Sequence, residues 1–347
     1  MKLRVFIIIL GLLLVLNGCS STGGVKEEEY DLTVEGGVIY GTLTVPQGEG
    51  PFKVAIIHPG SGPTDRDGNS AIAGSNNGLK MIAQELANNG IASIRYDKRG
   101  IAESMGLIKS ESELVFEDYI NDLVLWIEKA GSDERFSSVY LIGHSEGALI
   151  SAAAATKTQV SGFISLAGVG EPAYDTLIRQ LSTQPKEITD LTTPIIMELK
   201  EGRTVEDVPE MLQSLFRDSV QPYLISWFKY DPVKVYGEIN APVMVIQGDN
   251  DLQVTVEDAR MLGEGAGLEP VIIEGMNHIL KEAPTDSEGN LKTYQDPKLP
   301  LHPQLMDKII NFINKITIKS ARCGLFFSRI NDNVYQLHLW GICITDN

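Results

Sequence analysis

The sequence predicts an α/β fold in which a mostly parallel sheet is covered by helices on both faces, and three observations lead to this prediction. From Phe52 to Ala167, short apolar runs of strand length alternate with longer segments whose apolar residues recur at helical spacing. Between Gly143 and Gly147, a Gly-His-Ser-Glu-Gly turn joins an aliphatic run to an Ala-rich helical run. Between Gly170 and Ile239 only helical pieces occur, which predicts a helical cap over the sheet, with plain packing helices as the alternative.

The chain before the Gly143–Gly147 turn divides into recognisable elements. Tyr30–Val34 and Val38–Val45 read as strands around two glycines and predict an antiparallel start to the sheet. A helix is predicted over Leu79–Leu86, where the apolar spacing is helical and Gly90 follows as a C-terminal cap. The other elements expected here are strands at Phe52–Ile57, at Ile91–Tyr96 and from Val139 to the turn, and a helix with its inner face over Phe116–Ile127.

After the turn, the alternation continues through one strand, pauses for the cap at about 170–239, and then resumes. The expected elements are strands at Val160–Ala167, Pro242–Gln247 and Pro270–Ile273, a helix near Val256–Leu262, and a closing helix from Pro303 to about Ile316. We therefore assign one domain to residues 30–318. Residues 319–347 lack a clear periodicity, and no structure is predicted for this tail.

The Gly143–Gly147 turn has the form of a nucleophile elbow. In that geometry Ser145 lies in a strained conformation at the tip, and the glycines two positions to either side let strand and helix approach closely. The N-terminus of the following helix favours the negative charge that develops beside the serine. Because residue frequencies alone give about 0.2 such patterns in a chain of this length, the prediction depends on the strand and helix that flank it.

The N-terminal residues read as a targeting signal. Lys2 and Arg4 precede an apolar run over Val5–Leu16 that is short for a permanent transmembrane helix. The run ends before Cys19 and resembles the lipobox of bacterial lipoproteins, in which the cysteine becomes the lipidated N-terminus. We expect a signal peptide at 1–18, lipidation of Cys19 and a linker at 19–29, so that a membrane anchor holds the domain in the bacterial cell envelope, outside the cytoplasm. An ordinary cleaved signal and an uncleaved anchor are the alternatives.

The composition limits the partners and cofactors. The chain has 29 basic and 46 acidic residues and a formal charge of -17, which repels nucleic acid. No phosphate-binding loop, no His-Glu-x-x-His and no Cys-x-x-Cys pair occurs, so neither a cofactor nor a metal is expected. Cys323 and Cys343 are able to pair in an oxidising compartment, but no function is assigned to them.

Five landmarks in order resemble the α/β-hydrolase superfamily, and more narrowly its bacterial esterases and S33-type serine aminopeptidases. They are His58–Asn69, Tyr96–Gly100, the Gly143–Gly147 turn, Gly248–Asp251 and Gly275–His278. The resemblance runs from about residue 30 to residue 316. It implies an α/β-hydrolase fold, with a mostly parallel central sheet flanked by helices and a helical cap insertion.

The predicted nucleophile needs a base and an acid that orients the base. Of the five histidines, His278 follows the last predicted core strand, where this fold delivers its base. His144 adjoins Ser145 on a sharp turn, where neighbouring side chains diverge, and is expected to be structural or to line the cleft.

The acid is expected after the strand that ends at Gln247. The family pattern places it three residues after the turn glycine Gly248, which selects Asp251. Asp249 is then expected to cap the turn or to bind water. The catalytic residues are therefore predicted to be Ser145, Asp251 and His278, in the chain order expected of this fold.

Backbone N–H groups should form the oxyanion hole. One is expected from Glu146, after the nucleophile, and one from Ser61 in the loop that follows the third strand. Pro59 is an addition to the commoner His-Gly start of this loop and leaves its register open by one residue. In the same loop, Arg66 invites capture of a substrate carboxylate, but an ion-paired loop anchor is the interpretation we favour.

Together these residues predict a serine hydrolase, foremost a carboxylesterase that cleaves small-molecule esters with short or medium acyl chains through an acyl-enzyme. The alternative on the same fold is an aminopeptidase or a thioesterase. The second alternative, from a different class, is a non-catalytic lipoprotein that binds a ligand.

Overall fold

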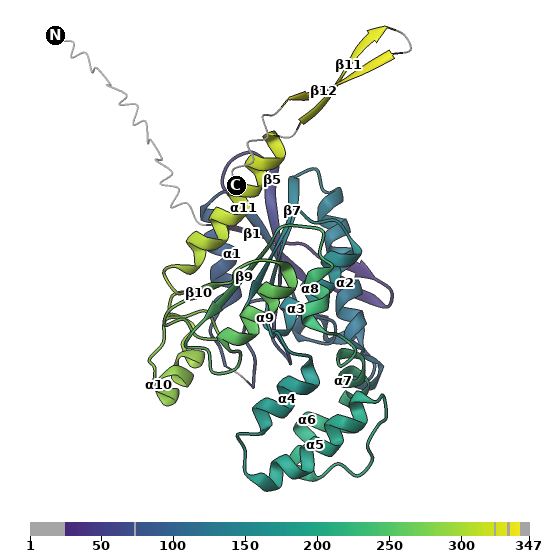
Figure 1. Ribbon diagram of the computed structural model, residues 1–347, viewed down its shortest axis with the longest axis vertical. Helices are drawn as coiled ribbons and strands as arrows, with labels where there is room; N and C mark the ends of the chain where they lie inside the picture. The colour runs from purple at the N-terminus through teal and green to yellow at the C-terminus, as the bar shows by residue number, and fades with distance from the viewer. Residues whose placement is uncertain (1–24, 73, 323, 332–333, 341–347) are drawn as a thin grey trace, which may run out of the picture.

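The computed structural model describes residues 25–72, 74–322, 324–331 and 334–340 (Figure 1). Its centre is an eight-stranded sheet in the order β1-β4-β6-β5-β7-β8-β9-β10. β4 pairs antiparallel with both β1 and β6, and every later pair in this sheet is parallel. The strands of the sheet are β1 (Lys26–Glu29), β4 (Gly41–Val45), β5 (Phe52–His58), β6 (Ile91–Tyr96), β7 (Phe136–His144), β8 (Gly162–Leu166), β9 (Val243–Gly248) and β10 (Val271–Ile273).

The interior strands are buried on both faces, as expected of parallel strands between two helical layers. In β5, Val54 and Ile56 belong to the core on one face, while Ala55 and Ile57 belong to the core on the other. The first face packs against α2 (Phe116–Ser132), α3 (Glu146–Lys157), α8 (Pro232–Gly237) and α9 (Val256–Ala266), and the second against α1 (Gly78–Asn88) and α11 (Leu305–Arg322). This arrangement confirms the predicted fold class.

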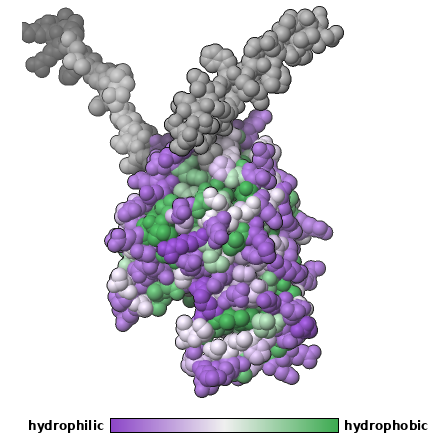
Figure 2. Space-filling view, in the orientation of Figure 1, coloured by the Kyte–Doolittle hydropathy of each residue, from purple (hydrophilic) through white to green (hydrophobic). Residues whose placement is uncertain are grey.

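The cap has a small core of its own. It consists of α4 (Ala173–Leu181), α5 (Lys186–Lys200), α6 (Gln213–Phe216) and α7 (Gln221–Trp227), which lie together beyond one end of the sheet (Figure 1). Its core includes Ile196, Leu199 and Phe216, which are fully buried. The face of the molecule seen in Figure 2 is mostly hydrophilic, with hydrophobic residues gathered in a few small areas, one of them on the cap.

Strand register brings the functional loops together. His58 at the end of β5 pairs with Gly143 near the end of β7, so the loop after β5 lies beside the Ser145 turn. Ile273 at the end of β10 pairs with Gly248 at the end of β9, so the two loops that carry Asp251 and His278 also leave the sheet side by side. The carboxyl edge of the sheet therefore carries the candidate site.

The structure departs from the predicted elements at both ends. Lys26–Glu29, expected within a linker, forms β1 because it pairs with the edge strand β4. A separate antiparallel hairpin, β2 (Leu32–Val34) with β3 (Gly37–Ile39), forms where the two strands were predicted. The second predicted strand is therefore divided between β3 and β4. The closing helix continues to Arg322, and β11 (Gly324–Asn331) pairs with β12 (Val334–Trp340) where no structure was predicted.

Several predictions concern residues outside the described ranges. These are the signal peptide, the lipidation of Cys19, and the two C-terminal cysteines, Cys323 and Cys343. Among the residues that the structure describes, no helix has the length and hydropathy needed to cross a membrane.

Candidate active site

The turn after β7 holds Ser145 in a conformation that side-chain-bearing residues rarely adopt. Its φ is 56° and its ψ is -123°, between the last strand residue, His144, and the first helical residue, Glu146. A Cβ atom at Gly143 would lie 2.4 Å from the Gly147 carbonyl oxygen, and one at Gly147 would lie 2.4 Å from the Pro59 oxygen. Both positions therefore require glycine, and the turn has the predicted geometry of a nucleophile elbow.

The structure brings Asp251 and His278 into direct contact. His278 Nδ1 lies 2.8 Å from Asp251 Oδ2, and both side chains are buried. The other carboxylate oxygen accepts hydrogen bonds from the backbone N–H groups of Gln253 and Val254, at 2.7 and 2.9 Å. Although burial opposes ionisation, the charge of His278 and these hydrogen bonds hold the pKa of Asp251 below its ordinary value. An ionised acid is thus fixed against one nitrogen of the candidate base.

His144 supports the candidate base rather than replacing it. Its Nε2 lies 2.8 Å from the carbonyl oxygen of His278. A carbonyl only accepts, so this nitrogen carries the proton and donates it. Burial, followed by the charge of His278, lowers the pKa of His144 to about 4, so the ring is neutral near pH 7. His144 therefore holds the backbone of the residue predicted to act as base.

Asp249 and Asp251 make different contacts. Asp249 is exposed, and its Oδ1 accepts a hydrogen bond of 2.7 Å from the backbone N–H of Gly275. This contact links the turn after β9 to the turn before His278. Asp249 is thus a turn anchor, whereas Asp251 meets the imidazole.

Sequence reasoning missed a buried amide chain that connects the loops of the acid and the base. Asn290, in the short helix α10 (Ser287–Lys292), donates to the carbonyl of Asn250 at 2.8 Å and accepts from the side chain of Asn277 at 3.0 Å. Asn250 precedes Asp251, and Asn277 precedes His278. The sequence offers no periodic signal for this contact, because α10 lies in a polar segment outside the alternating core.

The loop after β5 places Ser61 at the site. Ser61 and Ser145 line the same two cavities. Within the described residues, neither the backbone N–H of Ser61 nor that of Glu146 donates to a protein acceptor. Both groups are therefore available to a substrate oxygen, as an oxyanion hole requires.

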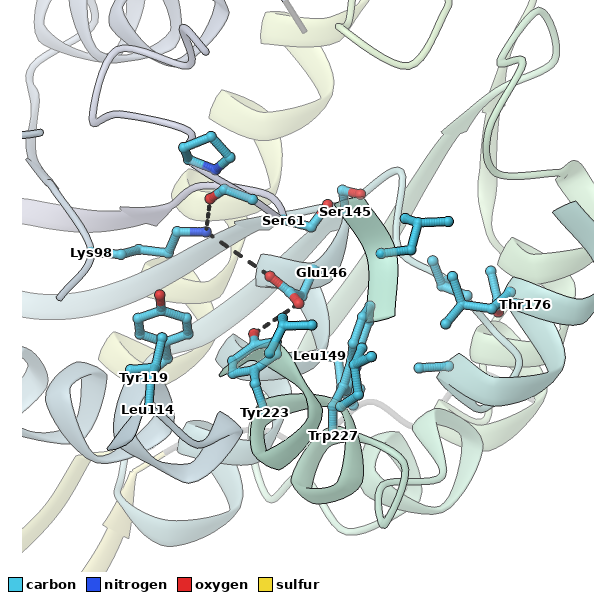
Figure 3. Close-up of a pocket in the computed structure, with 18 of the residues that line it drawn as sticks. Ser61, Lys98, Leu114, Tyr119, Ser145, Glu146, Leu149, Thr176, Tyr223 and Trp227 are labelled. Carbon is cyan, nitrogen blue, oxygen red and sulfur yellow. Dashed lines mark hydrogen bonds and ion pairs between the residues drawn. The ribbon is translucent and has the colours of Figure 1, made fainter. Parts of the chain in front are cut away.

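The Glu146 side chain and Lys98 form a buried polar group that was not predicted. The hydroxyl of Tyr223 donates to Glu146 Oε1 at 2.8 Å, and Lys98 Nζ lies 4.0 Å from Oε2 (Figure 3). Lys98 Nζ also donates to the carbonyl oxygens of Gly60 and Gly62, at 2.5 and 3.0 Å. The only signal in the sequence was the place of Lys98 in the Tyr96–Gly100 landmark.

Arg66 is an ion-paired anchor in the structure, as favoured from the sequence. Its guanidinium lies 2.6 Å from Asp97 Oδ2 and also pairs with Glu103. Arg99, in the turn after β6, pairs with Asp122 at 2.6 and 3.0 Å through two nitrogens. These ion pairs stabilise the loops that follow β5 and β6.

Two cavities meet at Ser145. The larger, about 720 Å³, lies between the sheet and the cap and is lined mainly by apolar residues, among them Leu149, Leu177, Leu215, Leu224 and Trp227. The smaller, about 90 Å³, is lined by His278 and by polar side chains that include Asn76, Gln253 and Tyr294. Within the described ranges, no three or more His, Cys, Asp or Glu side chains are placed to hold a metal ion.

The chain is similar in sequence to known hydrolases. A family model described as serine aminopeptidase, S33, matches residues 73–219, which include Ser145 and most of the cap. Esterase EstD of Thermotoga maritima is 28% identical over 267 residues, covering 73% of this chain and 60% of that protein. The chain thus spans about 60% of the length of this curated relative.

Solved structures share the architecture at low sequence identity. Est1E from Butyrivibrio proteoclasticus matches with a TM-score of 0.54 at 14% identity, covering 84% of this chain and 99% of that one. The α/β hydrolase GrgF from Penicillium sp. sh18 matches with a TM-score of 0.50 at 21% identity, covering 73% of this chain and 91% of that one. The chain has the α/β-hydrolase fold.

Proposed function

We propose that the chain is a serine hydrolase, foremost a carboxylesterase that cleaves esters with short or medium acyl chains. One observation carries the proposal: His278, hydrogen-bonded to Asp251, lines the same cavity as Ser145, which is strained at the tip of a strand-to-helix turn. The similarity to esterase EstD supports the choice of reaction class.

In the proposed mechanism, Ser145 Oγ attacks the acyl carbon while His278 Nε2 takes the hydroxyl proton. Asp251 holds the imidazole through Nδ1 and stabilises the imidazolium that forms. The N–H groups of Ser61 and Glu146 donate to the oxyanion of the tetrahedral intermediate. His278 then gives its proton to the leaving alcohol, and water, activated by the same residue, releases the acyl group from Ser145.

The two cavities support an assignment of the two sides of the ester. His278 must reach the leaving oxygen, and it belongs to the lining of the small cavity. The alcohol side therefore begins in the cavity of about 90 Å³, and the acyl chain extends into the apolar cavity of about 720 Å³ under the cap. An apolar chain gains free energy there because it leaves water.

The charges around the large cavity favour an ester over an aminopeptidase substrate. Three carboxylates line this cavity, those of Glu111, Glu146 and Glu171. Each has a basic partner within 4.0 Å: Arg217, Lys98 and Arg179, respectively. An aminopeptidase needs a free negative group to anchor the substrate amine, and the described lining of this cavity offers only neutralised ones. A thioester remains an alternative, because it carries no amine.

The proposal is tested with purified protein, p-nitrophenyl acetate and butyrate, and a fluorophosphonate probe that reacts with activated serines. We expect ester turnover and labelling at Ser145, and we expect Ser145→Ala to remove both while the fold is retained. Aminoacyl amides and thioesters, assayed beside the esters, separate the alternatives. Folded wild-type protein without turnover or labelling would exclude a serine hydrolase and favour the ligand-binding alternative.

We also propose that a lipid on Cys19 anchors the protein to the bacterial cell envelope, on the strength of the N-terminal sequence alone. Expression of the full chain with Cys19→Ala as the variant tests this. The wild-type protein is expected in the membrane fraction with an acylated N-terminal cysteine by mass spectrometry. Recovery of unacylated wild-type protein, distributed like the variant, would contradict the anchor.

A further inference from the structure

We infer that Lys98 is a positioning residue of the oxyanion hole, which directs the Ser61 N–H by holding the Gly60 carbonyl of the same peptide unit. The inference rests on the proposed function, because an oxyanion hole matters only where an acyl carbon is attacked. It adds a residue that does not touch the substrate but sets the direction of a group that does.

The contacts of Lys98 are unusual for a lysine. It follows β6 at the carboxyl edge of the sheet and is 1% exposed. Its ammonium donates to the carbonyl oxygens on both sides of Ser61, those of Gly60 at 2.5 Å and Gly62 at 3.0 Å. In Figure 3, Lys98 lies between this loop and the carboxylate of Glu146. An ammonium group has three protons, and the two carbonyl oxygens accept two of them.

The geometry of the peptide unit links the Lys98 contact with Gly60 O to the direction of the Ser61 N–H. In a trans peptide the C=O and N–H bonds point in opposite directions. When Lys98 holds the Gly60 oxygen, the Ser61 N–H of that unit points away from the ammonium. Glycines lie on both sides of Ser61, and Gly62 has a φ of 67°, so Cβ atoms of the neighbours do not restrict rotation of the peptide. The ammonium group holds the oxygen of this peptide unit directly.

The same lysine connects to the second donor of the oxyanion hole. Glu146 contributes its backbone N–H, and its side chain is the charge partner of Lys98 at 4.0 Å. Within the described residues, Glu146 Oε2 has no hydrogen-bond partner, so the lysine is its compensating charge. Burial lowers the pKa of Lys98, and the carboxylate opposes that shift. One buried ion pair therefore joins the loop of one donor to the residue of the other.

A purely structural anchor is the competing explanation, and the experiment is designed to separate the two. We compare Lys98→Met with Lys53→Met. Lys53 is on β5, the strand that leads into the same loop, and donates to Ile313 O at 3.4 Å and Asn314 Oδ1 at 2.7 Å, at the opposite edge of the sheet. Both variants lose a lysine that contacts a backbone carbonyl, but only one contact is in the oxyanion loop. End-point titration with the fluorophosphonate counts active sites, so kcat is expressed per active site.

Lys98→Met is expected to lower kcat per active site about a hundredfold with KM within about threefold, because loss of one oxyanion donor costs kcat by this order. The affinity for a trifluoromethyl ketone, which binds as a tetrahedral adduct, should fall in parallel with kcat/KM. Lys53→Met should keep the wild-type kcat. A structural anchor would instead lower the number of titrated sites and leave kcat per site unchanged, which would overturn the inference.

The double variant Lys98→Met/Glu146→Gln removes the unpaired buried carboxylate that the single variant leaves. It gives the same comparison if the single variant does not fold. Its kcat should stay low, since the contacts with Gly60 and Gly62 are still missing. Recovery of wild-type kcat would show that only charge compensation matters and would overturn the inference. Absence of turnover and labelling in the wild type would instead contradict the proposed function.

Discussion

At the scale of single residues, the candidate site depends on which aspartate meets the imidazole. Asp251 accepts from His278 Nδ1, while Asp249, two residues earlier, accepts from Gly275 N–H. The pair is a matched experiment within one turn, because the residue type, the strand and the loop are shared. The two differ in burial and in partners: Asp251 is buried and contacts the imidazole, whereas Asp249 is exposed and does not.

Asp251→Asn is expected to lower kcat by roughly a thousandfold or more, because an amide in this place favours the wrong tautomer of His278. Asp249→Asn, made as the control, should change kcat by less than about threefold. Steady-state kinetics with p-nitrophenyl butyrate measure both. Equal losses in the two variants would remove Asp251 from its proposed role.

The candidate residues that the sequence indicated are those that lie in a recognisable local motif. Ser145 lies in a turn between two glycines, and Asp251 and His278 each follow a predicted strand at places that the resemblance to the α/β-hydrolase superfamily implies. Lys98 and Asn290 act through contacts with residues 38 and 40 positions away, which no local pattern encodes. Such contacts depend on strand order, and the sequence did not predict that β6 and β5 would be neighbours.

At the scale of elements, α10 joins the acid loop to the base loop. Its residue Asn290 is fully buried and bonds to Asn250 and Asn277, the residues before Asp251 and His278. A buried amide in such a chain stabilises the folded state only while both its N–H group and its oxygen are hydrogen-bonded. The helix is six residues long, so it is held in place by this chain as much as by helical propensity.

Asn290→Leu should lower the free energy of unfolding by about 1–3 kcal/mol, because it leaves the Asn250 carbonyl without its donor and removes one of the two hydrogen bonds of the Asn277 amide nitrogen. It should also lower kcat, since the Asp251–His278 contact loses a support. Urea unfolding and kinetics measure the two effects, with Lys292→Gln on the exposed side of α10 as control. A variant with wild-type stability would contradict the role given to this chain of amides.

The cap is the element that the acyl chain would meet. Leu177 on α4 lines the cavity of about 720 Å³ and is only partly buried, so it can be enlarged with little strain in the sheet. Leu177→Trp is expected to reduce kcat/KM for octanoate at least about tenfold relative to acetate, because lost acyl methylenes are each worth about 1 kcal/mol. A chain-length series of p-nitrophenyl esters measures the ratio. An unchanged ratio would place the acyl chain elsewhere.

The elements themselves were predictable where apolar periodicity decided them. β6 begins and ends at the predicted residues, and the strands β5, β8 and β9 differ from prediction by one or two. β1 was missed because Lys26–Glu29 is a charged run, and only pairing with β4 makes it a strand. The closing helix was predicted to end near residue 316, but it continues to Arg322.

At the scale of the whole molecule, buried histidines make stability depend on pH. In the folded state the pKa of His144 is lowered from 6.5 to about 4, and that of His58 lies well below its ordinary value. Between pH 6.5 and 4 the unfolded chain binds protons that the folded chain does not. The folded state therefore loses stability as the pH falls from 6.5 to 4, and this contribution is fully present above pH 6.5.

His144→Gln should weaken this dependence, since one of the two histidines with a lowered pKa is gone and His58 remains. For a shift from 6.5 to about 4, the contribution of His144 is about 2 kcal/mol at pH 5. Urea unfolding of the wild type and the variant at pH 7 and pH 5 measures it: the stability lost between the two pH values should be smaller in the variant. Parallel losses would show that His144 is not the group that titrates.

The backbone of Ser145 has one more consequence, for attempts to engineer this molecule. A φ of 56° with a ψ of -123° suits glycine and costs a serine about 1–3 kcal/mol. Exchange of Ser145 for glycine would therefore raise the melting temperature while it removed the reactive hydroxyl. A library selected for heat resistance alone would be enriched in inactive clones at this position. Thermal selection of this protein has to be coupled to a turnover screen from its first round.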